Sequence, residues 1–155
     1  MKINWKVLIA SLAIVYLVAF IGSLFTSGNT NTSWYQEIKP SITPPNYVFP
    51  IVWNILFFLI ALSLYFAYIN SKGKLRKKVI VIFSINLILN ILWSVLFFSL
   101  KNPSAAFFEL ILLWLSIIAM IFITNKADKK ASLLLVPYLL WISFAGVLNW
   151  LAAFG

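Results

Sequence analysis

Five long apolar runs constrain this chain more than any other feature of its sequence. They cover residues 5–25, 47–69, 79–100, 104–124 and 132–154. A helix of about 20 apolar residues is long enough to cross the hydrocarbon core of a bilayer. Backbone groups in that core must be satisfied inside the segment, which favours helices. We therefore expect an all-α integral membrane protein, a bundle of five transmembrane helices, with residues 1–155 forming one membrane domain.

The composition leads to the same class of protein. Hydrophobic residues make up 63% of the chain and charged residues 10%, with a mean hydropathy of +1.02. Soluble domains have about 45–50% apolar and about 25% charged residues. The first run is too long for the apolar part of a secretory signal, and no small-residue cleavage site is evident after it. We expect it to remain as a span.

Missing residue types exclude several kinds of chemistry. The chain has no His and no Cys, which excludes the usual zinc, copper and iron–sulfur ligands and a Ser-His-Asp triad. Its three acids, Glu37, Glu109 and Asp128, lie in three different segments, so a catalytic carboxylate pair is not expected. We expect no metal site, no obligate cofactor and no ordinary acid–base enzyme. Glu109 lies inside the fourth run, and such a residue is a candidate functional group by default.

Lysine and arginine predict the orientation in the membrane. The net charge is +9, which in a soluble protein would suggest nucleic acid, but these residues lie in short connections between spans. The positive-inside rule places the side with more of them in the cytoplasm. We expect a cytoplasmic N-terminus in a prokaryotic plasma membrane. One side would carry ten basic residues and the other only Lys39 and Lys101; the ten are Lys2, Lys6, Lys72, Lys74, Arg76, Lys77, Lys78, Lys126, Lys129 and Lys130.

Residues 26–46 form the one long connection, which we call the lid. The other connections, residues 70–78, 101–103 and 125–131, are short turns. The lid contains Trp34 and Tyr35, followed by three prolines at positions 40, 44 and 45. Proline restricts its own backbone and the residue before it, so we expect a stiff segment that does not continue a helix. Its aromatic residues fit either a cover over the bundle or an interfacial aromatic belt.

Polar side chains form a stripe along the third run. Asn86, Asn90 and Ser94 are four residues apart and share one helix face, flanked by Trp93 and Phe97. Amides in hydrocarbon need partners, so this face should be turned toward protein. The pattern alone favours hydrogen bonds between helices over contacts with a ligand.

Large rings form matching stripes on the second and fifth runs. Trp53 and Phe57 are four residues apart, and Trp141 shares a face with Ala145 and Leu148. A tryptophan beside alanine leaves a flat wall with room next to it, which suits a flat apolar guest. Core or lipid packing is the commoner role of such stripes, and the pattern alone favours it.

Four segments together resemble the TspO/MBR family, the tryptophan-rich sensory proteins that include the mitochondrial translocator protein. They are WYQEIKPSITPP, PIVWNILF, NLILNILWSVLFF and VPYLLWISFAGVLN. Their order and their place in a five-span chain make the resemblance specific. It implies a five-helix bundle whose pocket is covered by the loop between the first two helices. It also implies binding of porphyrins such as protoporphyrin IX and, in some members, of benzodiazepine-site ligands or cholesterol.

The resemblance also assigns residues to that pocket. It implies that the ligand contacts Tyr35, Pro44, Trp53, Phe57, Asn90, Trp93, Ser94, Trp141, Ala145 and Leu148. Trp53 and Trp141 match the tryptophans linked in some bacterial members to light-dependent porphyrin breakdown, where they would be catalytic. The family's C-terminal sterol pattern needs a late Lys or Arg, and this chain has none after Lys130. Tight cholesterol binding is therefore not expected.

Three functions follow as hypotheses. The first is a tetrapyrrole-binding translocator or sensor that also accepts benzodiazepine-site ligands. The second is a light-dependent porphyrin-degrading enzyme, with porphyrin as its substrate. The third is a membrane interaction protein without a ligand. A homodimer is a further possibility, with Ala19 and Ser23 as the nearest small-residue pair for helix contact.

Overall fold

The computed structural model describes residues 3–155 and contains five helices long and apolar enough to cross a membrane. They are α1 (Trp5–Thr26), α3 (Val48–Ile69), α4 (Gly73–Ser94) continued by the π-helix η1 (Val95–Ser99), α5 (Pro103–Asn125), and α6 (Lys129–Leu133) followed by α7 (Val136–Phe154). The expected helical class and the five spans are confirmed. Lys2, counted above for orientation, lies outside the described residues.

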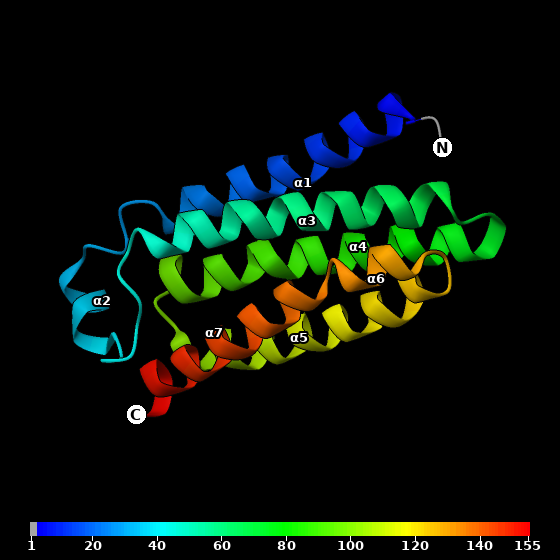
Figure 1. Ribbon diagram of the computed structural model, residues 1–155. Coiled ribbons are helices and arrows are strands. Elements are labelled where there is room, and N and C mark those ends of the chain that lie inside the picture. The colour runs from blue at the N-terminus through cyan, green and yellow to red at the C-terminus, as the bar shows by residue number, and fades with distance from the viewer. Residues whose placement is uncertain (1–2) are drawn as a thin grey trace.

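The long helices run side by side along the bundle, and α1 begins at the end opposite to the C-terminus (Figure 1). Helix α1 packs on α3 and α4, whereas α5 packs between α4 and α7. The lid lies at the same end as the C-terminus (Figure 1). We call this the lid end, and we call the opposite end, which carries the α3–α4 and α5–α6 connections, the basic end.

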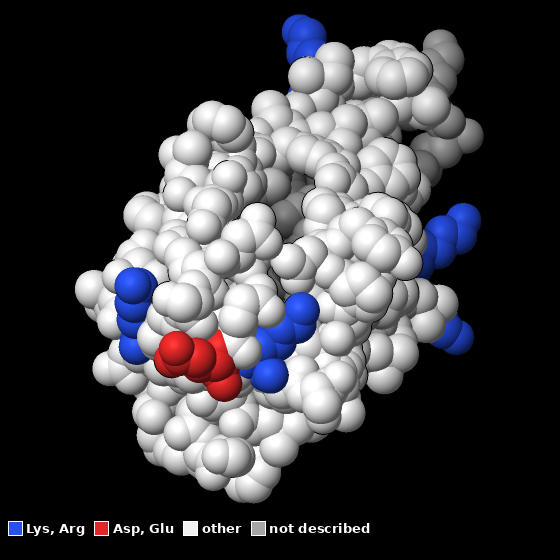
Figure 2. All heavy atoms as spheres, turned by 90° about the vertical axis from the view of Figure 1, so that its left-hand side faces the viewer, with Lys and Arg blue, Asp and Glu red and all other residues white. Residues whose placement is uncertain are grey.

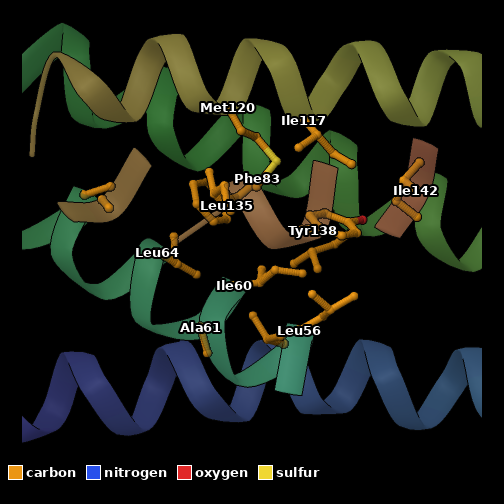
Figure 3. Packing of buried hydrophobic residues seen from close by; sticks show 14 of the residues in the cluster. Leu56, Ile60, Ala61, Leu64, Phe83, Ile117, Met120, Leu135, Tyr138 and Ile142 are labelled. Atoms are coloured by element: carbon orange, nitrogen blue, oxygen red, sulfur yellow. The ribbon is translucent and has the colours of Figure 1, made fainter. Parts of the chain in front are cut away.

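A hydrophobic core joins α3, α4, α5 and α7. Ile60, Phe83, Ile117 and Tyr138 point toward one another from these four helices and are at most 2% exposed (Figure 3). Large apolar side chains also cover the outside of the bundle, among them Ile9 and Leu17 on α1 and Leu140 on α7. A soluble protein does not leave so many exposed, and here they face the lipid.

A buried chain of hydrogen bonds links α4, α5 and α7. The Asn90 amide donates to the Tyr138 hydroxyl, at 3.2 Å, and this hydroxyl donates to Oδ1 of Asn86, also at 3.2 Å. The Asn86 amide donates to Ser116 Oγ at 2.8 Å. The predicted stripe on α4 therefore does form bonds between helices, with Tyr138 as the central residue.

The lid contains an element that the sequence analysis did not predict, since residues Ser33–Ile38 form a short helix, α2. The Thr32 hydroxyl caps it by accepting from the Tyr35 amide at 3.3 Å. The three lid prolines all lie after this helix, where they end it but cannot prevent it. No helix continues through the prolines, as expected, and a helix forms before them because the restriction imposed by proline reaches back only one residue.

Three helix boundaries also differ from the predictions. Helix α4 begins at Gly73, so most of the basic turn predicted over residues 70–78 is helical, since Lys and Arg are good helix formers. The connection over 125–131 is shorter, because α6 begins at Lys129. The fifth span is divided between α6 and α7, with Pro137 in the first turn of α7, a position that needs no amide hydrogen.

The lid packs on the π-helix. Tyr35 is 8% exposed and lies 6.4 Å from Phe97 and 5.8 Å from Phe98 between ring centroids. In η1 the Leu100 amide donates five residues back, to the Val95 carbonyl, at 2.9 Å. This wider turn places two successive phenylalanines under the lid. Burial raises the pKa of the Tyr35 phenol.

Replacing Tyr138 with phenylalanine tests the buried hydrogen bonds. Tyr138→Phe leaves the Asn86 carbonyl oxygen and the Asn90 amide without this partner, so we expect the free energy of unfolding to fall by about 1–2 kcal/mol. Denaturation in detergent, followed by tryptophan fluorescence, measures it. The control is Tyr16→Phe, which removes an exposed hydroxyl bond to the Asn54 carbonyl and should cost less than about 0.5 kcal/mol. Equal losses would contradict the central position of Tyr138.

Removing the Tyr35 ring tests how the lid is held. Tyr35→Ala takes a buried ring from the lid and its contacts with Phe97 and Phe98. We expect amide exchange of residues 33–38 to become at least about tenfold faster, because the local contacts weaken by more than about 1.4 kcal/mol. Hydrogen-exchange mass spectrometry measures the rates. Glu37→Ala, an exposed change on the same helix, should leave them within about twofold.

Candidate functional site

A cavity of about 660 Å³ opens inside the lid end of the bundle. Such a volume is typical of small-molecule sites, which span about 300–1,000 Å³. The lid covers it, and its walls come from the lid-end halves of α1 and α3 and from α4, η1, α5 and α7. Figure 2 looks onto this end, where the mostly uncharged surface is hollowed.

Nine of the ten residues that the resemblance implies lie together in the cavity wall. They are Tyr35, Trp53, Phe57, Asn90, Trp93, Ser94, Trp141, Ala145 and Leu148. Pro44 does not line the cavity, whereas its neighbours Pro40 and Thr43 do. The Thr43 amide donates to the Pro40 carbonyl at 3.0 Å, so the backbone turns here and successive side chains point in different directions.

The aromatic walls are held by contacts between rings. Trp53 stacks on Phe57 at 5.2 Å between centroids, and its edge meets Tyr138 at 6.2 Å. Trp141 meets Phe49 edge-on at 5.8 Å. Such pairs contribute about 0.5–1.5 kcal/mol beyond their buried area. Two indoles from α3 and α7 are thereby fixed in the wall.

The Trp93 indole is oriented by a polar contact that the sequence did not reveal. Its Nε1 donates to Asn149 Oδ1 at 2.9 Å, and the Asn149 amide donates to the Pro103 carbonyl at 2.8 Å. Asn149 is 2% exposed, so water does not compete strongly for these bonds. The sequence signal was present, since Asn149 is an amide inside an apolar span, but its partner lies 56 residues away.

Asn86 and Asn90 occupy one stripe but differ in their relation to the cavity. Asn86 is completely buried, and both ends of its amide are bonded to protein. Asn90 lines the cavity, and among the described residues its Oδ1 accepts no hydrogen bond. Asn90 therefore joins two helices through its nitrogen and still presents a free acceptor to the cavity.

Helix α1 contributes a wall that the sequence analysis missed. Tyr16, Ala19, Gly22, Ser23 and Thr26 all line the cavity. Ala19 and Ser23, considered above for contact between copies, are part of this wall. A Cβ added to Gly22 would lie 3.9 Å from Ser94 Oγ, an ordinary van der Waals distance, so α1 and α4 are close neighbours here. The spacing of small residues was the available signal, but it did not say what they face.

No charged side chain lines the cavity among residues 3–155. Its polar groups are neutral, and one of them, the Thr43 hydroxyl, is buried without a hydrogen-bond partner in the described part of the chain. Glu109 is 5% exposed on α5, and its two oxygens likewise have no such partner, but it is not part of this wall. No group of three or more metal-ligating residues occurs within residues 3–155. The cavity therefore fits a neutral apolar molecule or the apolar part of a larger one.

Comparisons with known sequences identify the same protein family. The profile of the TspO/MBR family matches residues 11–154. The "Tryptophan-rich protein TspO" of Archaeoglobus fulgidus is 43% identical over 143 residues, which cover 92% of each chain. The "Tryptophan-rich sensory protein" of Cereibacter sphaeroides is 30% identical, covering 96% of this chain and 90% of its own. The human "Translocator protein" is 30% identical, covering 86% and 80%.

The comparisons and the fold agree with each other. The matched residues contain most of α1, the other four apolar helices and every part of the cavity wall. Length and hydropathy make the chain a multi-pass integral membrane protein. This membrane protein belongs to the TspO/MBR family.

Proposed function

We propose that this protein binds a flat tetrapyrrole, such as protoporphyrin IX, in the cavity at the lid end and acts as a translocator or sensor of it. One observation carries the proposal: an uncharged cavity of about 660 Å³ is walled by fixed indoles and covered by a lid. The names of its relatives, sensory protein and translocator protein, support the same reading. Benzodiazepine-site ligands, which are aromatic and largely apolar, would use the same walls.

Different residues of the cavity wall would make different contacts with the ligand. Trp53 and Trp141 would stack against the macrocycle, since aromatic faces favour offset stacking. Asn90, whose Oδ1 is free, would hydrogen-bond a polar group at the edge of the macrocycle, which helps to orient the ring. Tyr35 and Thr43 of the lid would close over the ligand and exclude water.

The proposal includes an orientation in a prokaryotic plasma membrane. Described basic residues concentrate at the basic end, on the α3–α4 connection and the first turns of α4 and α6. By the positive-inside rule this end faces the cytoplasm, and the lid and cavity face outward. A ligand would then enter from the outer side or the outer leaflet.

Titration with protoporphyrin IX in the dark tests binding. We expect saturable one-site binding in neutral detergent, read from porphyrin absorbance and fluorescence. Trp53→Leu should weaken the affinity about tenfold, because stacking of a flat ring on an aromatic side chain is worth about 1–3 kcal/mol. Asn90→Ala should weaken it about threefold to tenfold through loss of one hydrogen bond.

The matched control is Trp150→Leu on α7. Trp150 is 48% exposed and is not part of the cavity wall, so its removal should change affinity by less than about twofold. Thermal unfolding checks that each variant is folded. Binding that does not saturate, or folded variants that all bind equally, would reject the pocket and favour the membrane interaction protein.

Illumination of the same samples in air tests the light-dependent enzyme. The placement of both Trp53 and Trp141 in the cavity wall favours this second candidate, since an indole next to an excited porphyrin is a possible electron donor. Dioxygen would be the oxidant. Loss of the porphyrin spectrum in the wild type, but not in Trp53→Phe or Trp141→Phe, would support the enzyme. An unchanged spectrum would reject the light-dependent enzyme and favour the translocator or sensor.

A further inference from the structure

Lys39, a basic residue of the lid, is hydrogen-bonded to a residue that lines the cavity. Its Nζ donates to Oδ1 of Asn46 at 3.4 Å, and the Asn46 side chain lines the cavity. The next residue, Pro40, also lines it. The ammonium group of Lys39 is therefore one hydrogen bond away from the cavity wall, at its rim.

The remaining charges at the lid end are placed differently. Lys101 lies over the outer part of the lid, with Nζ 5.9 Å from the centre of the Trp34 ring. Glu37 is exposed on α2, and Lys39 is hydrogen-bonded to the neutral Asn46 and not to this carboxylate. The charge of Lys39 is thus not neutralised by a bonded acid, and it remains available to an anion.

Because the cavity wall is uncharged, the position of Lys39 at the rim matters for a ligand that carries carboxylates. A carboxylate taken into a cavity without a cation loses its hydration and gains no charge partner, at a cost of several kcal/mol. A ligand with carboxylates along one edge would therefore bind with its apolar part inside and that edge at the rim. Lysine binds carboxylates through charge-assisted hydrogen bonds.

We propose that Lys39 anchors the anionic edge of the ligand, so that the cavity selects flat apolar molecules with carboxylates on one side. Asn46 holds the lysine side chain in position until the ligand arrives. This inference rests on the proposed function. It assigns a direction to the ligand, with its acid groups at the lid and its apolar part between Trp53 and Trp141.

The experiment compares protoporphyrin IX with its dimethyl ester, which has the same ring but no acid groups. Both are titrated into wild-type protein, Lys39→Met, Lys39→Arg and Lys101→Met in neutral detergent. We expect Lys39→Met to weaken binding of the free acid about threefold to tenfold and to leave the ester within about twofold. Lys39→Arg should retain most of the affinity for the acid, because the charge is kept.

Lys101→Met is the matched control. It removes the other lysine of the lid end, and it should change the affinity for either ligand by less than about twofold. Rising salt should lower the affinity for the free acid more in the wild type than in Lys39→Met, since salt screens the attraction between exposed charges.

Three results would overturn the inference. If Lys39→Met lowers the affinity for the acid and for the ester equally, the lysine acts on the lid structure and not on the carboxylates. If it changes neither ligand, the rim charge does not take part in binding. If neither ligand binds the wild type saturably, the proposed function fails together with the inference, which distinguishes that failure from the first two.

Discussion

Inside a bilayer a polar group has no water to bond to, and the arrangement of this bundle follows from that constraint. Asn86, Asn90, Ser116 and Tyr138 come from three helices and satisfy one another in a single chain of hydrogen bonds. Apolar packing alone holds helices weakly in lipid, because lipid tails are as apolar as leucine. These bonds fix the register of α4, α5 and α7, and the cavity lies directly beside them.

The chain of hydrogen bonds ends at Asn90, which lines the cavity. Below it, toward the basic end, large side chains such as Ile60, Phe83 and Ile117 fill the space between the helices (Figure 3). Above it, Gly22 and Ala145 are small, and the indoles of Trp53 and Trp141 are held against Phe57 and Phe49 at the sides. The lid completes the enclosure through Tyr35, which packs on the two phenylalanines of the π-helix.

Charge differs between the basic end, the cavity wall and the rim of the cavity. The basic end carries most lysines, the wall of the cavity carries no charge within the described residues, and the rim carries Lys39. A membrane-embedded site of this kind favours molecules that are themselves amphipathic. The apolar wall supplies binding energy through contact with flat rings, and a charge at the rim adds selectivity without the cost of burial.

The sequence by itself determined the five spans, the lid and the aromatic and amide stripes, because hydropathy and helical spacing are local properties. Of the ten residues that the resemblance assigned to a pocket, the structure places nine in the cavity wall. Only the tertiary structure decided that Asn86 is fully bonded while Asn90 keeps a free oxygen, since their partners lie on other helices. It also brought Asn149 to Trp93, Gly22 to Ser94 and Lys39 to Asn46 at the rim. Which face of a helix meets protein, lipid or an open cavity depends on neighbours that are distant in the chain, and residue spacing does not contain that information.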